Sequence, residues 1–472
     1  MKRMFRIPFI QLMACLVFPI SALAKHFEHI VLIIQENRTP DNLFQGLCAT
    51  ANACGVPPLA NQYDILTSNW LNKNSKSGVT QPFTVALAND KYDPGHDHES
   101  FHLMCDPASN GACKMDGAAD EGCSGDCPNN FAFAYIPNTS GVLDPYLALA
   151  TQYGWANFMF QTNQGPSFPA HQFLFGATSA PSAADDQNGT FAAENGSGGM
   201  NDIGCATSGT HVQLIDANGQ EKSGNTIFPC FERTTVSDLI SHQGFTWRYY
   251  APSQDFIWTA PNSISHICAP QGQQCTGSDW TANVDLVPKD VLTDIATCNL
   301  RNVSWIIPTG QSSDHPEMNN GTGPSWVASI VNAIGNSTCT DGTTSYWDDT
   351  AIIVTWDDWG GWYDHEAPTI LAYPQGGYQF GFRVPLIFVS AYTPAGYISN
   401  NRQDFGSIVR FVEYNFGLKE GYLGFADART GTDLLKFFDF SRQPRQFTTI
   451  PASFDANYFI HDTSPPLPPD DD

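Results

Sequence analysis

The stretch HIVLIIQENRTPDNLF, residues 29–44, indicates how this chain folds. Residues 29–34 form an apolar run rich in β-branched side chains, which is typical of a strand buried on both faces. Three polar residues, Glu36, Asn37 and Arg38, follow where that strand must end. Ligands of an open α/β sheet bind outside the carboxyl ends of its strands. The stretch therefore predicts a central strand with functional groups at its end.

Five further apolar runs resemble the first, and segments with helical periodicity lie between them. The predicted strands are residues 29–34, 155–160, 245–250, 303–307, 351–355 and 384–390. Apolar residues spaced three and four apart predict helices at residues 236–241, 325–334 and 407–416. Apolar strands that alternate with helices predict an α/β fold with a mostly parallel central sheet sandwiched by helices. We expect the Gly-, Ser-, Asn- and Asp-rich residues 61–90, 179–204 and 261–283 to be long loop insertions.

Residues 1–24 are typical of a secretory signal peptide. Three cations precede an apolar run that closes on Ala22-Leu23-Ala24, the small-x-small pattern of a cleavage site. We expect a secreted or periplasmic protein whose mature chain starts near Lys25. A lipoprotein anchored at Cys15 is the alternative, although apolar residues 16–24 would then form its mature N-terminus. We expect no transmembrane segment in the mature chain, because no later run is long and apolar enough.

The cysteines predict disulfide bonds. Of the 13 in the chain, 12 remain once Cys15 leaves with the signal, an even number in a chain bound for an oxidising compartment. Structural zinc is the weaker alternative, because the paired C-x2-C spacing is missing. The complete connectivity stays open, but four pairs of close neighbours could staple local loops: Cys48 with Cys54, Cys105 with Cys113, Cys123 with Cys127, and Cys268 with Cys275.

The composition limits the classes of partner that the chain can bind and indicates how its domains are organised. A formal net charge of −25, which would be about −28 without the signal, repels phosphate backbones and argues against a nucleic-acid partner. Solubility after export explains much of that charge. We expect residues 25–463 to form a single catalytic domain, and the proline-rich acidic tail, residues 464–472, to be disordered. The oligomeric state stays open.

Two adjacent carboxylates follow the predicted strand at residues 351–355. Asp357 and Asp358 repel each other at a strand end unless a cation or a proton intervenes. A divalent metal is the simplest remedy, and Glu36 and Asn37 would add oxygen ligands from a neighbouring strand. We expect at least one ion, with Mg, Ca, Mn and Zn all open. Helix caps and loop hydrogen bonds are the structural alternative for any one of these residues.

A serine and several histidines complete the candidate chemistry. Ser167 lies in GPSFP, residues 165–169, and opens a helix-like pattern that continues through Phe175. It is either a helix N-cap or a nucleophile, because a helix N-terminus stabilises anionic oxygen and a metal lowers the pKa of the serine hydroxyl. Histidines beside polar or small residues are each structural or functional, and together they could donate to a phosphate and protonate its leaving group. These are His96, His98, His266, His315 and His365.

Six motifs in order carry a resemblance to a known family. They are HIVLIIQENRTPDNLF, DPGHDHESFH with KMDGA, GPSFPAHQF, SWIIPTGQSSDHP, TAIIVTWDDWGGWYDHEAP and GFRVPLIFVS, within residues 27–418. The chain resembles the bacterial phosphoesterases that include exported phospholipases C and metal-dependent acid phosphatases, in the alkaline-phosphatase-like superfamily. The resemblance implies an alkaline-phosphatase-like fold and a metal-dependent phosphoric ester hydrolase that acts on a phosphate ester or phospholipid.

The resemblance also implies a role for each matching residue. The implied metal ligands are Glu36, Asn37, Ser167, Asp357 and Asp358, and Ser167 would also be the nucleophile that forms a phosphoserine. The implied contacts to the phosphate are Asn37, His96, His266 and His315. We expect His315 to protonate the leaving alcohol and the pH optimum to be acidic. Asp364, His365 and Arg38 would support the site.

The chain also departs from the family pattern. Ser167 stands where the phospholipases often carry threonine, and His171 where they carry arginine, which brings the phosphatase branch nearer than a lipid substrate. Residues 403–407, QDFGS, lack the histidine of the family's Asp-His-x-Ser. A sulfatase-like hydrolase is one alternative, because residues 167–171 echo the Ser/Cys-x-Pro-x-Arg signal without its arginine. A non-catalytic exported binding module, stapled by calcium, is the other.

Overall fold

The computed structural model describes residues 27–88, 91–197, 202–338, 345–373, 376–429, 431–432 and 434–467. The predicted signal peptide, residues 1–24, and the last part of the predicted tail, residues 468–472, lie outside this range. No helix among the described residues reaches the length and apolarity that crossing a bilayer requires.

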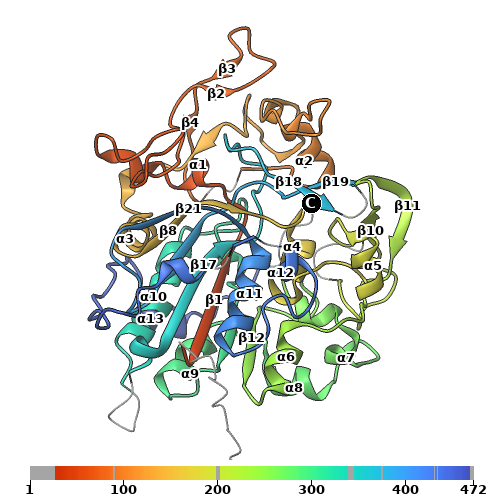
Figure 1. Cartoon of the computed structure of the whole chain (residues 1–472), viewed down its shortest axis with the longest axis vertical. Coiled ribbons are helices and arrows are strands. Elements are labelled where there is room, and N and C mark those ends of the chain that lie inside the picture. Colours follow the sequence, from red (N-terminus) through yellow and green to blue (C-terminus); the bar gives the residue numbers. More distant parts are fainter. Residues whose placement is uncertain are drawn as a thin grey trace, which may run out of the picture.

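A central sheet of eight strands organises the molecule (Figure 1). β20 runs antiparallel to both of its neighbours, and the other strand pairs in this sheet are parallel. The predicted mostly parallel α/β sheet is therefore confirmed, and all six predicted strands belong to it. Their order across the sheet is β15 (Val284–Asp285), β12 (Trp247–Tyr250), β16 (Val303–Ile306), β1 (His29–Gln35), β17 (Thr350–Trp356), β20 (Leu386–Val389), β8 (Gly154–Phe160) and β21 (Tyr397–Asp404).

β1 lies inside the sheet, between β16 and β17. Residues 30–34 of β1 are all buried, as a continuous apolar run in a doubly covered sheet requires. The parallel register pairs Gln35 with Trp356. The residues that follow them, Glu36 and Asp357, are therefore neighbours at the carboxyl edge of the sheet.

Two groups of helices cover the sheet. α10 packs against α3, α9 and α13, whereas α11 packs against α4, α6 and α12. Figure 1 shows α10 and α13 on one side of β1, and α11 and α6 on the other. The three predicted helices are confirmed as α6, α10 and α11. The bounds of the eight helices are α3 (Asp144–Gln152), α4 (Ser167–Gly176), α6 (Val236–His242), α9 (Asp290–Ala296), α10 (Gly323–Gly335), α11 (Phe405–Asn415), α12 (Ala426–Arg429) and α13 (Ala456–His461).

Short elements lie in the predicted insertions, residues 61–90, 179–204 and 261–283, and in the other loops of the chain. Their helices are α1 (Pro40–Leu43), α2 (His98–Cys105), α5 (Ala183–Gln187), α7 (Ser265–Cys268) and α8 (Ser278–Asn283). Their strands are β2 (Trp70–Leu71), β3 (Val79–Thr80), β4 (Phe83–Thr84), β5 (Tyr92–Pro94), β6 (Cys123–Gly125), β7 (Ala134–Tyr135), β9 (Phe191–Ala192), β10 (Val212–Ile215), β11 (Glu221–Ile227), β13 (Pro270–Gln271), β14 (Gln274–Cys275), β18 (Ile370–Tyr373) and β19 (Gly376–Gln379). In Figure 1 the loops with β2 to β4 and α2 rise above the carboxyl edge of the sheet.

Disulfides staple several of these loops. The four predicted neighbour pairs, Cys48–Cys54, Cys105–Cys113, Cys123–Cys127 and Cys268–Cys275, all form, and Cys205–Cys230 is a fifth bond. Cys298 is also disulfide-bonded. The prediction of loops held by disulfides is thus confirmed.

The first part of the predicted tail lies against the folded chain. Gln311 donates from Nε2 to the Pro465 carbonyl at 2.6 Å and accepts the Leu467 N–H at 3.1 Å. One amide side chain thus pairs with two backbone groups of residues 464–467, and the disorder of the tail stays a prediction. Composition alone does not reveal such a partner.

Candidate active site

Four polar residues from the ends of β1 and β17 form the centre of the site. Glu36, Asn37, Asp357 and Asp358 are all fully buried. The Asn37 N–H donates to Asp357 Oδ1 at 3.1 Å, which ties the two strand ends together. Asn37 adopts a φ of 60°, a left-handed conformation that asparagine tolerates better than most residues. The predicted metal ligands from these two strands therefore do come together.

Helix α4 brings Ser167 to this group. The N-cap of α4 is Pro166, which makes no side-chain capping hydrogen bond, and Ser167 is the first residue of the helix. Ser167 Oγ instead donates to Asp358 Oδ2 at 3.0 Å, and the other oxygen of Asp358 accepts the Gly360 N–H at 2.7 Å. The alternative in which Ser167 is merely a helix cap does not describe this geometry.

His171 lies one turn further along α4 and points into the same cluster. Its Nε2 is 3.3 Å from Glu36 Oε1 and 3.6 Å from Asp357 Oδ2. His171 was not among the site residues predicted from the sequence. The signal was present, because residues four apart on a helix share a face and Ser167 and His171 are four apart.

Several buried polar atoms of the cluster have no hydrogen-bond partner among the described residues. They are both carboxylate oxygens of Glu36, Oδ1 of Asn37, Oδ2 of Asp357 and both ring nitrogens of His171. Unpaired buried polar atoms are costly, and charged ones most of all. One ligand atom from each of Glu36, His171 and Asp357 lies within 4.8 Å of the others. Carboxylate, amide and imidazole donors that converge in this way fit a divalent cation.

The charges of the cluster oppose one another in the absence of a cation. Burial, followed by the charge of Asp357, raises the pKa of Glu36 well above its ordinary value. The same two causes raise the pKa of Asp358. Burial lowers the pKa of His171 to about 4, so its imidazole is neutral and retains a lone pair for a ligand.

His96 orients the amide of Asn37. A carbonyl can only accept, so His96 donates from Nδ1 to the Pro94 carbonyl, which lies 3.0 Å away. In the neutral ring, Nε2 then accepts from Asn37 Nδ2 at 2.9 Å. Asn37 Oδ1 is thereby left as the oxygen available to a cation.

His315 lies beside His96, with 6.0 Å between the ring centroids. His315 donates from Nδ1 to the Pro316 carbonyl at 2.7 Å, and its Nε2 lies 3.8 Å from Asp93 Oδ2. A nearby carboxylate stabilises the protonated ring that a general acid requires. The structure thus brings two of the three histidines predicted to contact phosphate to the site.

Arg38 supports the segment that carries His315. Its guanidinium donates to the Asp314 carbonyl, at 2.9 Å from Nε and 2.6 Å from Nη2, and lies 5.0 Å from the Trp362 ring centroid. Burial lowers the pKa of Arg38 to about 10. Arg38 thus holds the segment that carries His315, and its supporting role in the site stays a prediction.

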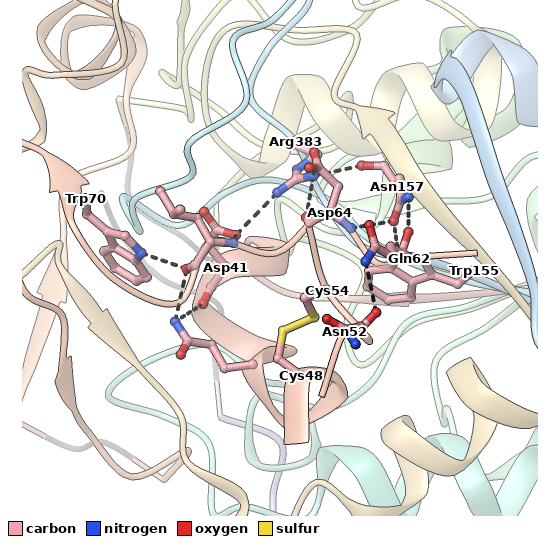
Figure 2. The surroundings of a disulfide bond; sticks show 12 residues. Asp41, Cys48, Asn52, Cys54, Gln62, Asp64, Trp70, Trp155, Asn157 and Arg383 are labelled. Carbon is pink, nitrogen blue, oxygen red and sulfur yellow. Dashed lines mark hydrogen bonds and ion pairs between the residues drawn. A yellow bond between two sulfur atoms is a disulfide. The ribbon is translucent and has the colours of Figure 1, made fainter. Parts of the chain in front are cut away.

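Asp364 and His365 belong to a separate ionic network around Arg383. Arg383 donates to Asp364 and Asp64 at 2.9 Å each, while His365 Nδ1 lies 2.7 Å from Asp41 Oδ2. Figure 2 shows Arg383 between Asp41 and Asp64, with the Cys48–Cys54 disulfide beneath the Asp64 segment. This network links the segment after β17 to the Asp64 loop. It is a brace for the site, not a part of the metal-type cluster.

His266 does not join the site. Its ring lies 2.8 Å from Glu232 and 3.0 Å from Asp238, and its side chain is 33% exposed. No contact described for His266 reaches the cluster, so its predicted phosphate contact is corrected to a surface ion pair between α6 and α7. Asp238, then burial, then Glu232 act on its ring, and the net effect raises its pKa to about 9.

His98 also lies outside the cluster. Its Nδ1 is 2.6 Å from the Gln164 carbonyl and its Nε2 is 3.1 Å from His102 Nε2.

Fold and site together define an α/β protein with a buried serine, three buried histidines and a cation-type cluster at the carboxyl edge of its sheet. The chain belongs to the Phosphoesterase family, whose model matches residues 27–419. The family suggested by the ordered motifs is therefore confirmed.

Its curated relatives include bacterial phospholipases C. The chain is 22% identical to "Non-hemolytic phospholipase C" of Pseudomonas aeruginosa over 92% of this chain and 60% of that protein. It is 23% identical to "Phospholipase C A" of Mycobacterium tuberculosis over 88% of this chain and 78% of that protein. The chain thus spans about three fifths of the length of the Pseudomonas relative.

Among solved structures, one described as a protein in the alkaline phosphatase superfamily from Vibrio parahaemolyticus aligns with a TM-score of 0.34. It is 12% identical and covers 77% of this chain and 73% of that one.

Proposed function

We propose that this protein is an exported, metal-dependent phosphoric ester hydrolase that uses Ser167 as its nucleophile. The observation that carries the proposal is the contact between Ser167 Oγ and Asp358 Oδ2, beside a cluster of buried ligand atoms without partners. Membership of the Phosphoesterase family supports the reaction class. The names of the phospholipase C relatives support a phosphorus ester as substrate.

The cluster supplies the ligands for a divalent ion. Glu36, Asn37, Asp357, Asp358 and Ser167 are the residues that would hold it. When bound, such an ion lowers the pKa of the serine hydroxyl and stabilises negative charge on the phosphate oxygens. The unpaired oxygens of Glu36 and Asp357 fit that need, because each has no partner of its own among the described residues.

Ser167 attacks phosphorus and a phosphoserine forms. The hydroxyl already donates to Asp358 Oδ2, so this carboxylate orients Oγ and takes its proton as the O–P bond forms. The proton returns to Oγ when water hydrolyses the phosphoserine. Burial of the cluster keeps bulk solvent away from the reacting oxygen during the first step.

His315 is the preferred acid for the departing alcohol. Its Nδ1 is engaged by the Pro316 carbonyl, which directs Nε2 away from the backbone, toward Asp93 and the side of His96. A proton on Nε2 passes to the leaving oxygen as the P–O bond breaks, and the ring then accepts a proton from the water that hydrolyses the phosphoserine. Two inversions at phosphorus give overall retention of configuration. An acidic pH optimum follows, because the first step needs the protonated ring.

The substrate is a phosphate monoester, a phosphodiester or a phospholipid. Ser167 and His171 stand where the phospholipases of the family often carry threonine and arginine, which favours the phosphatase side. Residues 1–24 and the disulfides support export to the periplasm or beyond.

The experiment compares the full chain with Ser167→Ala on four substrates: p-nitrophenyl phosphate, bis-p-nitrophenyl phosphate, phosphatidylcholine and p-nitrophenyl sulfate. Ser329→Ala is the matched control, because Ser329 is buried in α10 and bonds only to the Trp326 carbonyl among described contacts. We expect phosphoester turnover in the wild type and in Ser329→Ala, and at least about a thousandfold loss in Ser167→Ala. Acid quenching with labelled substrate should trap phosphate on the Ser167 peptide.

Three outcomes would count against the proposal. Turnover of the sulfate ester alone would favour a sulfatase. Metal binding without any turnover would favour a binding module. Inversion of configuration with a chiral phosphate ester would exclude the phosphoserine.

A further inference from the structure

His171 is the site residue whose contacts the proposed function has not used. It is fully buried, and neither of its ring nitrogens has a hydrogen-bond partner among the described residues. In water, each nitrogen of a neutral imidazole makes a hydrogen bond. Burying the ring without any partner loses both bonds and costs free energy. A ligand that Nε2 can bind would remove that cost.

The surroundings of Nε2 point to a cation as this ligand. Two carboxylate oxygens lie close to Nε2, Glu36 Oε1 at 3.3 Å and Asp357 Oδ2 at 3.6 Å, and both are also without hydrogen-bond partners among the described residues. Separations of this size are what donor atoms of one coordination sphere show when each lies about 2.0–2.2 Å from the same ion. The ring of His171 lies beside that of Trp258. The two ring planes are inclined by 27° and the ring centroids are 6.5 Å apart.

We propose that His171 Nε2 is a nitrogen ligand of the ion that Glu36, Asn37, Ser167, Asp357 and Asp358 hold. This inference rests on the proposed function, and it narrows the identity of the ion. Magnesium and calcium prefer oxygen ligands only, whereas zinc, manganese, iron and cobalt accept imidazole. The site therefore selects zinc or a transition metal over magnesium and calcium.

The position of His171 gives the ligand a second consequence. Ser167 and His171 lie on successive turns of α4, so one rigid helix presents the nucleophile and a metal ligand to the same ion. A ligand on that helix fixes the distance between the ion and Ser167 Oγ more firmly than a ligand from a loop would.

The test is spectroscopic and does not depend on turnover. The full chain is stripped with a chelator, reloaded with one equivalent of Mn²⁺, and examined by electron spin-echo envelope modulation. We expect coupling to a directly bound ¹⁴N nucleus in the wild type, and its replacement by ¹⁵N coupling when the protein contains ¹⁵N-labelled histidine. In His171→Gln the nitrogen coupling should disappear, and calorimetry should show Zn²⁺ affinity at least about tenfold weaker, with Mg²⁺ affinity little changed.

His102→Gln is the matched control. His102 and His98 form the other close imidazole pair described above, with 3.1 Å between their Nε2 atoms, and no contact described for either joins them to the cluster. The nitrogen coupling should be unchanged in this variant. Its loss would mean that the ion binds to the His98–His102 pair, which would overturn the proposal.

The remaining outcomes separate this inference from the proposed function. Stoichiometric Mn²⁺ without nitrogen coupling in the wild type, or coupling that persists in a folded His171→Gln, would overturn the role of His171 and leave the hydrolase intact. If His171→Gln fails to fold, the labelled wild type keeps the proposal falsifiable, because an ion bound without ¹⁵N-histidine coupling would overturn it. A wild type that binds neither Mn²⁺ nor Zn²⁺ would overturn both.

Discussion

Ser167 Oγ and Asp358 Oδ2 lie 3.0 Å apart, although 191 positions separate the two residues in the chain. The contact joins the first turn of α4 to the end of β17. It exists because β8, which leads into α4, runs parallel to β17, so both strands deliver their following residues to the same edge of the sheet. The consequences of this edge can be tested one residue at a time.

Asp358→Asn should keep the shape of the site and remove one negative charge. A cation loses an anionic ligand, so we expect metal affinity to fall at least about tenfold and turnover to fall with it. Metal content by mass spectrometry and kcat/KM are the measurements. Asp439→Asn, at a surface position that pairs with Arg442, is the control and should change neither. Wild-type metal content and turnover in Asp358→Asn would remove this residue from the site.

Glu36→Gln should change how the stability of the metal-free protein depends on pH. Burial and then Asp357 raise the pKa of Glu36 in the folded chain. The unfolded chain therefore ionises first, and the wild type loses stability as pH rises above the ordinary value of 4.5 toward the raised pKa. Urea denaturation in chelator at pH 5 and pH 8 measures the effect. The loss between the two pH values should be smaller in Glu36→Gln, and equal losses would contradict the prediction.

Gly360→Ala should displace Asn37. Gly360 has a φ of 59°, and a Cβ atom there would lie 2.5 Å from the Asn37 carbonyl oxygen and 2.6 Å from its Cβ. We expect a loss of stability of about 2–4 kcal/mol and weaker metal binding, measured by denaturation and calorimetry. Gly78→Ala isolates the conformational strain, because Gly78 has a φ of 74° and open space around its Cβ position. Its expected cost is about 1 kcal/mol, with unchanged metal binding.

Arg383→Met should be among the most destabilising substitutions in the chain. It leaves Asp41, Asp64 and Asp364 buried without their shared cation, at an expected cost of about 3–5 kcal/mol in the free energy of unfolding. Arg402→Met is the control, because Arg402 pairs with Glu366 at a partly exposed site and should cost less than about 1 kcal/mol. Equal costs would show that the network around Arg383 does not brace the fold.

His266→Gln should alter stability without altering turnover. The folded-state pKa of His266 is raised to about 9. The stabilisation is therefore fully present below the unfolded value of about 6.5 and is lost as pH rises through about 9. We expect a difference on the order of 1 kcal/mol between wild type and variant at pH 6, reduced by solvent screening, and none at pH 10. A large loss of turnover would return His266 to the site.

The sequence predicts the centre of the fold well because that centre is apolar and regular. Buried parallel strands are continuous hydrophobic runs, and six of the eight central strands can be recognised in the sequence by such a run. β21, with the sequence YISNNRQD, escapes because it lies at the edge of the sheet and is largely polar. β15 was not predicted because it is only two residues long.

The sequence predicts those site residues that follow neighbouring strands of the sheet. It does not predict the residues that other parts of the chain bring to the site. Glu36 and Asp357 follow neighbouring parallel strands, so their meeting could be expected from the sequence. His266 was misplaced because nothing local distinguishes a surface ion pair from a phosphate contact. His171 was missed because its position was compared with an arginine of relatives instead of with the face of its own helix. The single catalytic domain, the signal peptide and the absence of a nucleic-acid partner stay predictions.

The central place of β1 has a consequence for how the chain is made. β1 is the first strand of the described residues to leave the ribosome, yet its two neighbours begin only at Val303 and Thr350. Synthesis proceeds at about 5–20 residues per second. The apolar side chains of β1 therefore stay uncovered by the neighbouring strands for a time on the order of tens of seconds. A nascent chain that stops before Thr350 cannot enclose this strand and should be aggregation-prone. Synthesis therefore has to be complete, or a holding factor present, before the molecule can acquire its core.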